Sequence, residues 1–347
     1  MKIKKAITFC ASSIGDALMA KYLLENIHAK FPDARLGIAV AGRGEMLRDL
    51  FAAYPWIEVV VANRRNLRSL WRLLRDWRGS DLATTQVAMK NGGAFGLASK
   101  LAARLLARRG GLFGFKDSSR LNRLLYDRLL PIRNDVSVIE YEREILRAAG
   151  IDVSFKYPSF IFNTSTKALE RFNITPGQYV FVHMFAGNDS RGISPHNRRA
   201  LLAELRERLP SDFVLVISGG AGDRVAAEYA TRGMRSTIVI AGNTTLQETA
   251  NLISNSLGVI SICTGVGHIA AHLRKPIIIL RTCMGKQWWV PSQYGAEIPS
   301  AIFTREDFCI KGHKKMDFPH CLNEINMSEV AIVANNIFVS NTAHVAV

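Results

Sequence analysis

The sequence predicts an α/β protein made of two Rossmann-like domains. Strand-like apolar runs alternate with helical segments through most of the chain, which is typical of a parallel sheet covered by helices. The 347 residues exceed what one hydrophobic core usually holds. The alternation is interrupted once, between Asp152 and Pro176, where we place the domain junction. We therefore expect an N-terminal domain of residues 1–165 and a C-terminal domain of residues 166–347.

The N-terminal half begins with a βαβαβ pattern. Apolar runs predict strands over 5–10, 36–40 and 58–61, and helical spacing predicts helices over 16–30 and 45–53.

A basic amphipathic helix is predicted after the third strand. Its apolar residues keep helical spacing and its arginines fall on the opposite face. The two sets are Leu67, Leu70, Trp71, Leu74 and Trp77, and Arg64, Arg68, Arg72 and Arg75. Such a helix can contact a membrane, or it can simply pack its apolar face on the sheet.

The C-terminal half repeats the alternation after a Thr-Pro-Gly turn signal at 175–177. The expected strands are 179–184, 213–218, 237–240, 258–262 and 276–280. The expected helices are 197–208, 223–231, 246–255 and 267–273. One option for the last helix of the chain is to pack back on the N-terminal domain.

The net charge of +16 is concentrated in one segment. Residues 64–133 hold 13 Arg and 3 Lys against 4 Asp, a net +12. Such a field attracts anionic lipid headgroups, phosphorylated glycans or nucleic acid, and a solvated surface is the alternative. No nucleic-acid-binding motif accompanies the charge, so we expect no nucleic-acid partner.

The sequence predicts a soluble, cytoplasmic protein. No stretch of about 20 uncharged apolar residues is present. The apolar run at 6–11 is too short for a secretory signal and is better explained as the first strand. The five cysteines are scattered and odd in number, which does not imply disulfides.

The first candidate site is Ser12-Ser13-Ile14-Gly15-Asp16, where the first strand turns into the first helix. Ligands of open α/β folds bind at this edge of the sheet. Gly15 allows a close backbone turn, and Asp16 projects from the start of the helix. The alternative role for Asp16 is an ordinary helix-capping carboxylate.

The second candidate site is the segment 263–271, Cys-Thr-Gly-Val-Gly-His-Ile-Ala-Ala, which follows a strand and opens a helix. The backbone N–H groups and the dipole of such a helix start suit a diphosphate. Thr264 and Gly265 form the junction, and His268 in the first turn can donate to the same anion. A structural role for His268 is the alternative.

Two more loops follow strands in the same half. Residues 185–195 offer small polar donors and Arg191, and residues 219–223 offer Asp223, a carboxylate that can accept ribose hydroxyls. Trp288 and Trp289 can line a pocket or simply pack in the core. The possible zinc ligands Cys309, His313, His320 and Cys321 match no common zinc spacing. We therefore expect neither a metal site nor a cofactor.

Together these segments resemble family 9 of the glycosyltransferases, the ADP-heptose:lipopolysaccharide heptosyltransferase family. Its Ser-Ser-x-Gly-Asp is similar to 12–16, and its Asp-Thr-Gly-x-x-His-Leu-Ala is similar to 263–270. Residues 241–248 and 274–276 resemble two further family segments, and Asp223 matches the family's acidic residue after a Gly-rich strand end. The resemblance covers nearly the whole chain.

The resemblance implies a GT-B fold, in which the two domains face each other across a cleft. It implies an inverting, metal-independent transfer of a sugar, with Asp16 as base, from a nucleotide sugar to the lipopolysaccharide core or lipid A. The enzyme would be peripheral to the inner membrane, on its cytoplasmic side. The implied donor-binding residues are Gly187, Asn188, Arg191, Asp223, Thr244, Thr264, Gly265 and His268. The acceptor-binding residues are Ser13, Arg64, Arg68 and Arg72.

Two positions depart from the family pattern. Cys263 stands where the family has Asp, and Gly192 stands where it has Lys, with Arg191 beside it. Arg keeps the charge of Lys but not its reach or hydration. These departures leave two alternatives open. The protein can be a family member that uses another donor sugar, or an impaired relative that binds a sugar nucleotide or core glycan without turnover.

Overall fold

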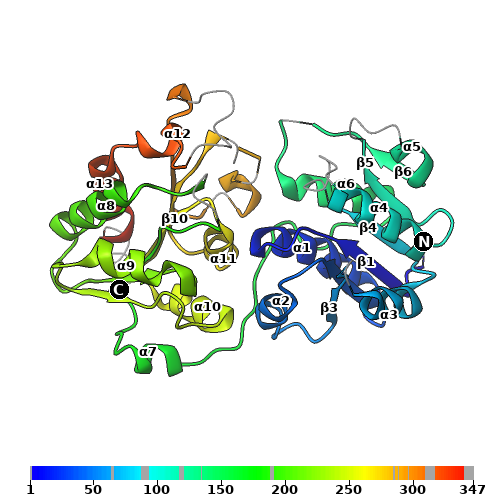
Figure 1. Ribbon diagram of the computed structural model, residues 1–347, viewed down its shortest axis with the longest axis horizontal. Helices are drawn as coiled ribbons and strands as arrows, with labels where there is room; N and C mark the ends of the chain where they lie inside the picture. Colours follow the sequence, from blue (N-terminus) through cyan, green and yellow to red (C-terminus); the bar gives the residue numbers. More distant parts are fainter. Residues whose placement is uncertain are drawn as a thin grey trace. The chain divides into compact units, whose positions relative to one another are not determined.

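The computed structural model describes residues 2–63, 66–86, 94–116, 121–133, 135–187, 191–283, 286–287, 289–295, 297–308 and 317–339 (Figure 1). The chain divides into two compact units, Met1–Ser159 and Phe160–Val347. This division and our expected boundary after residue 165 both fall in a segment, 151–166, without regular secondary structure. In the described part of the chain, no helix has the length and apolar character needed to cross a bilayer.

The first unit contains a parallel sheet with the strand order β3-β2-β1-β4-β5-β6. Its strands are β1 Lys5–Phe9, β2 Arg35–Val40, β3 Ile57–Val61, β4 Leu82–Thr85, β5 Leu112–Phe115 and β6 Arg128–Leu130. The strand order changes direction between β1 and β4. In open α/β sheets, this is the point at which ligands bind.

Helices connect these strands. They are α1 Ile14–Lys30, α2 Gly44–Leu50, α3 Leu67–Trp77, α4 Ala94–Leu106, α5 Asn122–Leu125 and α6 Val138–Ala148. Helix α1 is buried from Gly15 to Ile27 and contacts α6. Because this helix is covered on all sides, its N-terminal end is held firmly against the sheet.

Only part of the apolar face of α3 is buried. Its inward face consists of Leu73 and Trp77, whereas Leu67 is 80% exposed and Trp71 is 60% exposed. Trp71 therefore shares the outer face with the arginines, and the Arg75 guanidinium lies 4.9 Å from its ring centroid. The apolar and basic faces of α3 are present as predicted, but the apolar face is wide and only its Leu73 and Trp77 side is buried.

The second unit repeats the same topology, with the strand order β12-β11-β10-β7-β8-β9. Its strands are β7 Tyr179–His183, β8 Val214–Ser218, β9 Thr237–Val239, β10 Gly258–Ile262, β11 Ile277–Leu280 and β12 Ser300–Phe303. Its helices are α7 Lys167–Arg171, α8 Pro195–Arg208, α9 Arg224–Thr231, α10 Leu246–Asn255, α11 Gly265–His272, α12 His320–Asn323 and α13 Met327–Val339, with 3₁₀ turns η3 Ala221–Asp223, η5 Pro291–Gln293 and η6 Glu306–Phe308. The change of strand direction lies between β7 and β10.

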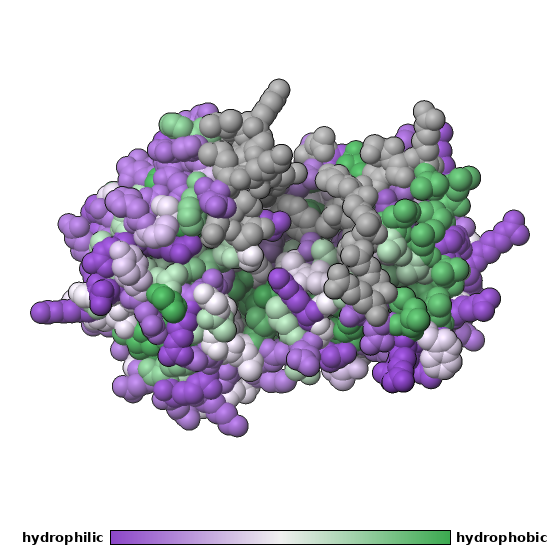
Figure 2. Space-filling model, in the orientation of Figure 1, coloured by the Kyte–Doolittle hydropathy of each residue, from purple (hydrophilic) through white to green (hydrophobic). Residues whose placement is uncertain are grey.

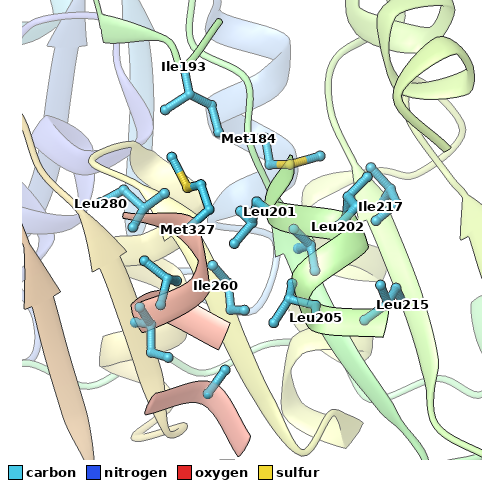
Figure 3. Close-up of a cluster of buried hydrophobic side chains, with 14 of the residues drawn as sticks. Met184, Ile193, Leu201, Leu202, Leu205, Leu215, Ile217, Ile260, Leu280 and Met327 are labelled. Carbon is cyan, nitrogen blue, oxygen red and sulfur yellow. The ribbon is translucent and has the colours of Figure 1, made fainter. Parts of the chain in front are cut away.

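The core of the second unit forms between α8, the sheet and α13 (Figure 3). Leu201 and Leu205 of α8 lie among buried side chains that include Ile260 of β10 and Val330 of α13. Helix α13 packs on α8, so this last described helix, for which packing on the N-terminal domain was one option, finds its main partner in its own unit.

The predicted class is confirmed: each unit is a doubly wound α/β unit of Rossmann topology. All strands and helices expected over 5–61 and 179–280 are present, with ends within three residues of the expected ones. The strands and helices between α3 and β7, including α7, and those after β11, were not delimited from the sequence.

Candidate active site

Asp16 lies at the point where the first sheet changes direction. Strand β1 ends at Phe9, and α1 begins at Ile14 with Ser13 as its N-cap. Asp16 therefore stands in the first helical turn, at the carboxyl end of β1 and beside β4. Topology alone places this carboxylate where a ligand of the first unit is expected.

Ser13 fixes the Asp16 carboxylate. The Ser13 hydroxyl donates to Asp16 Oδ2 at 2.5 Å and accepts from the Asp16 backbone N–H at 3.2 Å. Asp16 is 8% exposed. This reciprocal pair is a helix-capping arrangement, so the capping role exists together with any catalytic one. Both hydrogen bonds of the Ser13 hydroxyl serve Asp16, which makes Ser13 a positioning residue; its contact with an acceptor stays a prediction.

A buried polar pair that the sequence reasoning missed lies next to Asp16. Gln86, directly after β4, donates from Nε2 to the Asp16 carbonyl oxygen at 2.9 Å and to Glu142 Oε1 of α6 at 3.3 Å. Burial raises the pKa of Glu142 to about 8. Burial, followed by the charges of Asp16 and Glu142, raises the pKa of Cys10 well above its usual value. The sequence feature that could have indicated Gln86 is a polar residue placed directly after a buried strand.

The second unit places its candidate loops at the corresponding point of its own sheet. Helix α11 begins at Gly265, directly after β10, with Thr264 as its N-cap. Both residues are partly exposed, so the unsatisfied N–H groups of this helix start can reach a ligand. A Cβ on Gly267 would come within 2.9 Å of Ile279 and 3.0 Å of Trp289, so this glycine lets α11 pack tightly on β11.

Two arginines act on the thiol of Cys263, the residue before Thr264. Burial raises the pKa of Cys263 to about 11, and the charges of Arg191 and Arg281 oppose that rise. Both arginines therefore contribute positive charge at the residue before the start of α11. Arg281 directly follows β11, donates to Glu306 Oε1 at 2.9 Å and was not among the predicted residues. The sequence feature that could have indicated Arg281 is a charged residue at the carboxyl end of an apolar strand.

His268 is a neutral, buried side chain. Burial lowers its pKa to about 4, and its ring stacks on Trp289 with 4.9 Å between centroids. Its Nδ1 lies 2.5 Å from the Tyr294 hydroxyl. At neutral pH the ring can therefore give at most a neutral hydrogen bond to an anion, and the structural alternative for His268 gains support.

The remaining donor-site predictions are spread along the same sheet. Gly187 is exposed, and nothing lies within 4 Å of the position of a Cβ. Asp223 Oδ2 accepts from the Gly220 N–H at 2.8 Å, which stabilises the loop after β8. Thr244, after β9, lies 3.0 Å from Thr249 through its hydroxyl oxygen. Asn188 lies outside the described residues.

The predicted acceptor arginines lie on α3. Arg68 and Arg72 are exposed and line a surface pocket with Leu67 and Trp71. Helix α3 contacts β3 and α4, and its Trp77 packs at Gly37 of β2. Arg64 lies outside the described residues.

Metal-ligating groups do not gather in the described part of the chain. No three or more His, Cys, Asp or Glu side chains there are placed to hold a metal ion. His320 lies 3.4 Å from Glu324, and Cys321 is buried. The other two zinc candidates, Cys309 and His313, lie outside the described residues, as does Trp288, while Trp289 is buried against His268.

Comparison with known families decides the assignment. A family model described as glycosyltransferase family 9 (heptosyltransferase) matches residues 100–298, more than half of the chain. The chain belongs to glycosyltransferase family 9. The resemblance read from the motifs is thereby confirmed, and the protein is a glycosyltransferase of the heptosyltransferase family. A comparison with curated protein sequences gave no match.

Solved structures of family 9 share the fold. E. coli ADP-heptose lipopolysaccharide heptosyltransferase II is 16% identical, with a TM-score of 0.71 over 97% of this chain and 99% of that one. A family 9 glycosyltransferase from Veillonella parvula DSM 2008 is 13% identical, with a TM-score of 0.73 over 97% of both chains. E. coli heptosyltransferase WaaC with ADP-2-deoxy-2-fluoro heptose is 16% identical, with a TM-score of 0.63 over 97% and 99%. The GT-B class is thereby confirmed, while identities this low show the fold alone.

Proposed function

We propose that this family 9 enzyme transfers heptose from ADP-heptose to the lipopolysaccharide inner core, with inversion and without a metal ion. The observation that carries the proposal is Asp16, which is held by Ser13 where the first sheet changes direction. Support for the donor comes from the family and from the heptosyltransferase structure that holds an ADP-heptose analogue.

In the proposed reaction, Asp16 is the general base. A hydroxyl oxygen of the acceptor sugar forms a bond to the anomeric carbon, and the bond from that carbon to the diphosphate oxygen breaks. The hydroxyl proton passes to the Asp16 carboxylate, and the nucleoside diphosphate leaves. A single displacement of this kind inverts the anomeric centre. The base must come within about 3 Å of the hydroxyl, and the bond from Ser13 keeps the carboxylate in one orientation.

In the proposed donor site, the leaving diphosphate is stabilised by the protein alone. The start of α11 offers N–H groups and a positive dipole end at Thr264 and Gly265. Arg191 and Arg281 add positive charge beside it. These groups act where negative charge develops in the transition state, which is the role a metal ion fills in other transferases. The proposed site around the nucleotide and sugar is completed by Gly187, Asn188, Asp223 and Thr244. His268 contributes to it as a neutral ring in the first turn of α11.

The proposed acceptor is the lipopolysaccharide core or lipid A, bound on the first unit. Its phosphates and carboxylates suit the +12 segment, in which Arg68 and Arg72 are exposed. Since this acceptor has a lipid anchor, we place the enzyme at the cytoplasmic face of the inner membrane. No nucleic-acid partner and no cofactor are part of the proposal.

A second function is favoured by one observation. Cys263 replaces the family's carboxylate, and its thiol stays protonated because its pKa is about 11. A changed donor site suits a member that uses another sugar, or one that binds a sugar nucleotide or core glycan without turnover.

The test compares wild type with Asp16→Asn in a transfer assay that uses ADP-heptose and several other nucleotide sugars. The acceptors are core glycans with and without heptose. Asp16→Asn should lower kcat by about a hundredfold or more while donor affinity stays near wild type. Turnover within roughly threefold of wild type would remove Asp16 from the mechanism.

EDTA should leave activity unchanged, and a requirement for added Mg²⁺ or Mn²⁺ would contradict the metal-free reaction. Donor binding without any transfer would favour the impaired relative.

A further inference from the structure

The first unit has a hydrophobic area on its outside, over α3, α4 and α5. Among the described residues, 13 large hydrophobic side chains are exposed, and seven of them belong to these helices or to the residue before α5. The seven, which we name the outer patch, are Leu67, Trp71, Leu97, Leu101, Leu105, Leu121 and Leu124. Helix α4 contacts both α3 and α5, and Figure 2 shows a broad hydrophobic area on this part of the first unit. An exposed apolar area of this extent marks an interaction site.

Helix α4 exposes a stripe of leucines. Leu97, Leu101 and Leu105 are four residues apart and are 38%, 46% and 62% exposed. On its inner side, Lys100 is buried and donates from Nζ to Asn122 Oδ1 at 3.1 Å, and Ala103 and Leu106 belong to the core. Charged residues normally face water and leucines the core. A helix that buries a lysine and exposes a leucine stripe is suited to an apolar phase outside the protein.

The surroundings of the outer patch are positively charged. Three acidic residues nearby are each paired: Asp76 with Arg75, Asp81 with Arg108 and Asp127 with Arg104, at 2.5, 2.6 and 2.8 Å. Several exposed arginines have no ion pair with a described residue, and four of them are Arg68, Arg72, Arg109 and Arg123. The outer patch is therefore apolar in its middle and cationic around it.

We propose that the outer patch docks the enzyme on the surface of a bilayer that contains anionic lipids. The leucines of α4 enter the outer part of the acyl region, Trp71 lies at the headgroup level, and the four arginines pair with lipid phosphates. The proposal names the surface that would hold the enzyme near a lipid-anchored acceptor, and in that respect it rests on the proposed function.

Charge favours a bilayer over a second copy of the chain. A symmetric dimer through this surface would bring the same cationic groups of both copies together, and juxtaposed like charges oppose association. Anionic lipid phosphates instead complement Arg68, Arg72, Arg109 and Arg123.

The experiment measures binding of the full chain to lipid vesicles by flotation. Vesicles of equal parts phosphatidylglycerol and phosphatidylcholine are compared with pure phosphatidylcholine, at low and high salt. The first variant is Leu97→Ser/Leu101→Ser/Leu105→Ser, whose side chains point outward. The second is Arg68→Gln/Arg72→Gln. The matched control is Val225→Ser/Tyr229→Ser on α9, where both side chains are also exposed, at 78% and 61%.

Wild type should bind the anionic vesicles, more weakly at high salt, and bind neutral vesicles far less. The leucine variant should lose at least about tenfold in affinity, since it removes most of the apolar area that inserts. It should keep wild-type transfer to a soluble, lipid-free core acceptor. The arginine variant should lose affinity mainly at low salt, and the control should match wild type.

Wild-type affinity in the leucine variant, or no wild-type binding to anionic vesicles, would overturn the proposal. A concentration-dependent dimer that the leucine variant abolishes would assign the surface to a second copy. Intact transfer without vesicle binding would refute the docking alone, whereas vesicle binding without transfer from any donor would refute the proposed function alone. If the leucine variant does not fold, the affinity of the arginine variant for anionic vesicles at low salt decides whether the outer patch docks on the bilayer.

Discussion

The ring nitrogen Nδ1 of His268 lies 2.5 Å from the phenol oxygen of Tyr294, and both side chains are buried. Since burial also lowers the pKa of His268 to about 4, this pair is a neutral hydrogen bond inside the second unit. It joins the first turn of α11, the helix whose start is proposed to bind the diphosphate, to the segment around Tyr294.

Tyr294→Phe should destabilise the protein by about 1–3 kcal/mol, because it leaves a buried ring nitrogen without its partner. The KM for the donor should also rise in this variant if the hydrogen bond is what holds α11 in position. Urea unfolding and donor titration measure the two effects. Tyr229→Phe, in an exposed position of α9, serves as the control and should leave both unchanged. A stable Tyr294→Phe variant with unaltered donor KM would show that the hydrogen bond positions nothing.

Glu142→Gln should change the pH dependence of stability. The pKa of Glu142 is raised by burial to about 8, so the folded protein keeps this proton where the unfolded chain, with a pKa near 4.5, has lost it. Stability from this group is therefore fully present below about pH 4.5 and is lost as pH rises to about 8, by at most about 1.4 kcal/mol per pH unit. The variant should equal wild type near pH 5 and become the more stable protein by pH 8.

Urea unfolding of both proteins at several pH values gives the measurement. Glu207→Gln, at an exposed position of α8, is the control and should shift stability equally at each pH. A constant difference between Glu142→Gln and wild type would mean that Glu142 is ionised in the folded protein.

Cys263→Asp tests the main departure from the family pattern. A carboxylate there would lie beside Arg191 and Arg281 and would compete with a diphosphate for their charge. If the protein uses ADP-heptose, the change should be neutral or improve kcat/KM for it. If it uses another sugar, the variant should bind the native donor more weakly and ADP-heptose more tightly than wild type does. The reason is that buried polar groups reject a ligand that leaves them unpaired. Cys263→Asn, similar in shape but uncharged, separates the effect of charge. Loss of activity toward every donor, in a folded protein, would contradict both versions.

Arg281→Gln should weaken ADP binding by about tenfold or more, the usual effect of losing a hydrogen bond to a charged group. Glu306→Gln should leave ADP binding unchanged or tighten it, because Arg281 loses the carboxylate at 2.9 Å that now competes for it. Calorimetric titration of both variants with ADP provides the affinities. Arg305→Gln, an exposed position paired with Asp307, should match wild type. Equal ADP affinity in Arg281→Gln and wild type would exclude Arg281 from the donor site.

Local pattern determined most of the fold. Apolar runs with period two and helical spacing are properties of neighbouring residues, so strands such as β10 and helices such as α10 were found with their observed ends. The positions of Asp16 and Thr264 also follow from the chain alone, because each lies at the start of a helix that comes soon after a recognisable strand. Loops after parallel strands meet at one edge of a sheet, so the sequence was enough to expect ligand sites there.

Only the tertiary structure decided which side chains meet and which faces are covered. Gln86 and Glu142 come together with Asp16 from separate elements, and the charge of Arg281 acts on Cys263 from the end of the neighbouring strand, so no short sequence window contains either relationship. Periodicity shows that α3 has an apolar face but not which side of that face meets the sheet, and it leaves Trp71 outside as readily as inside. The charge of His268 was likewise undetermined, since a pKa depends on burial by residues such as Tyr294 that are distant in the chain.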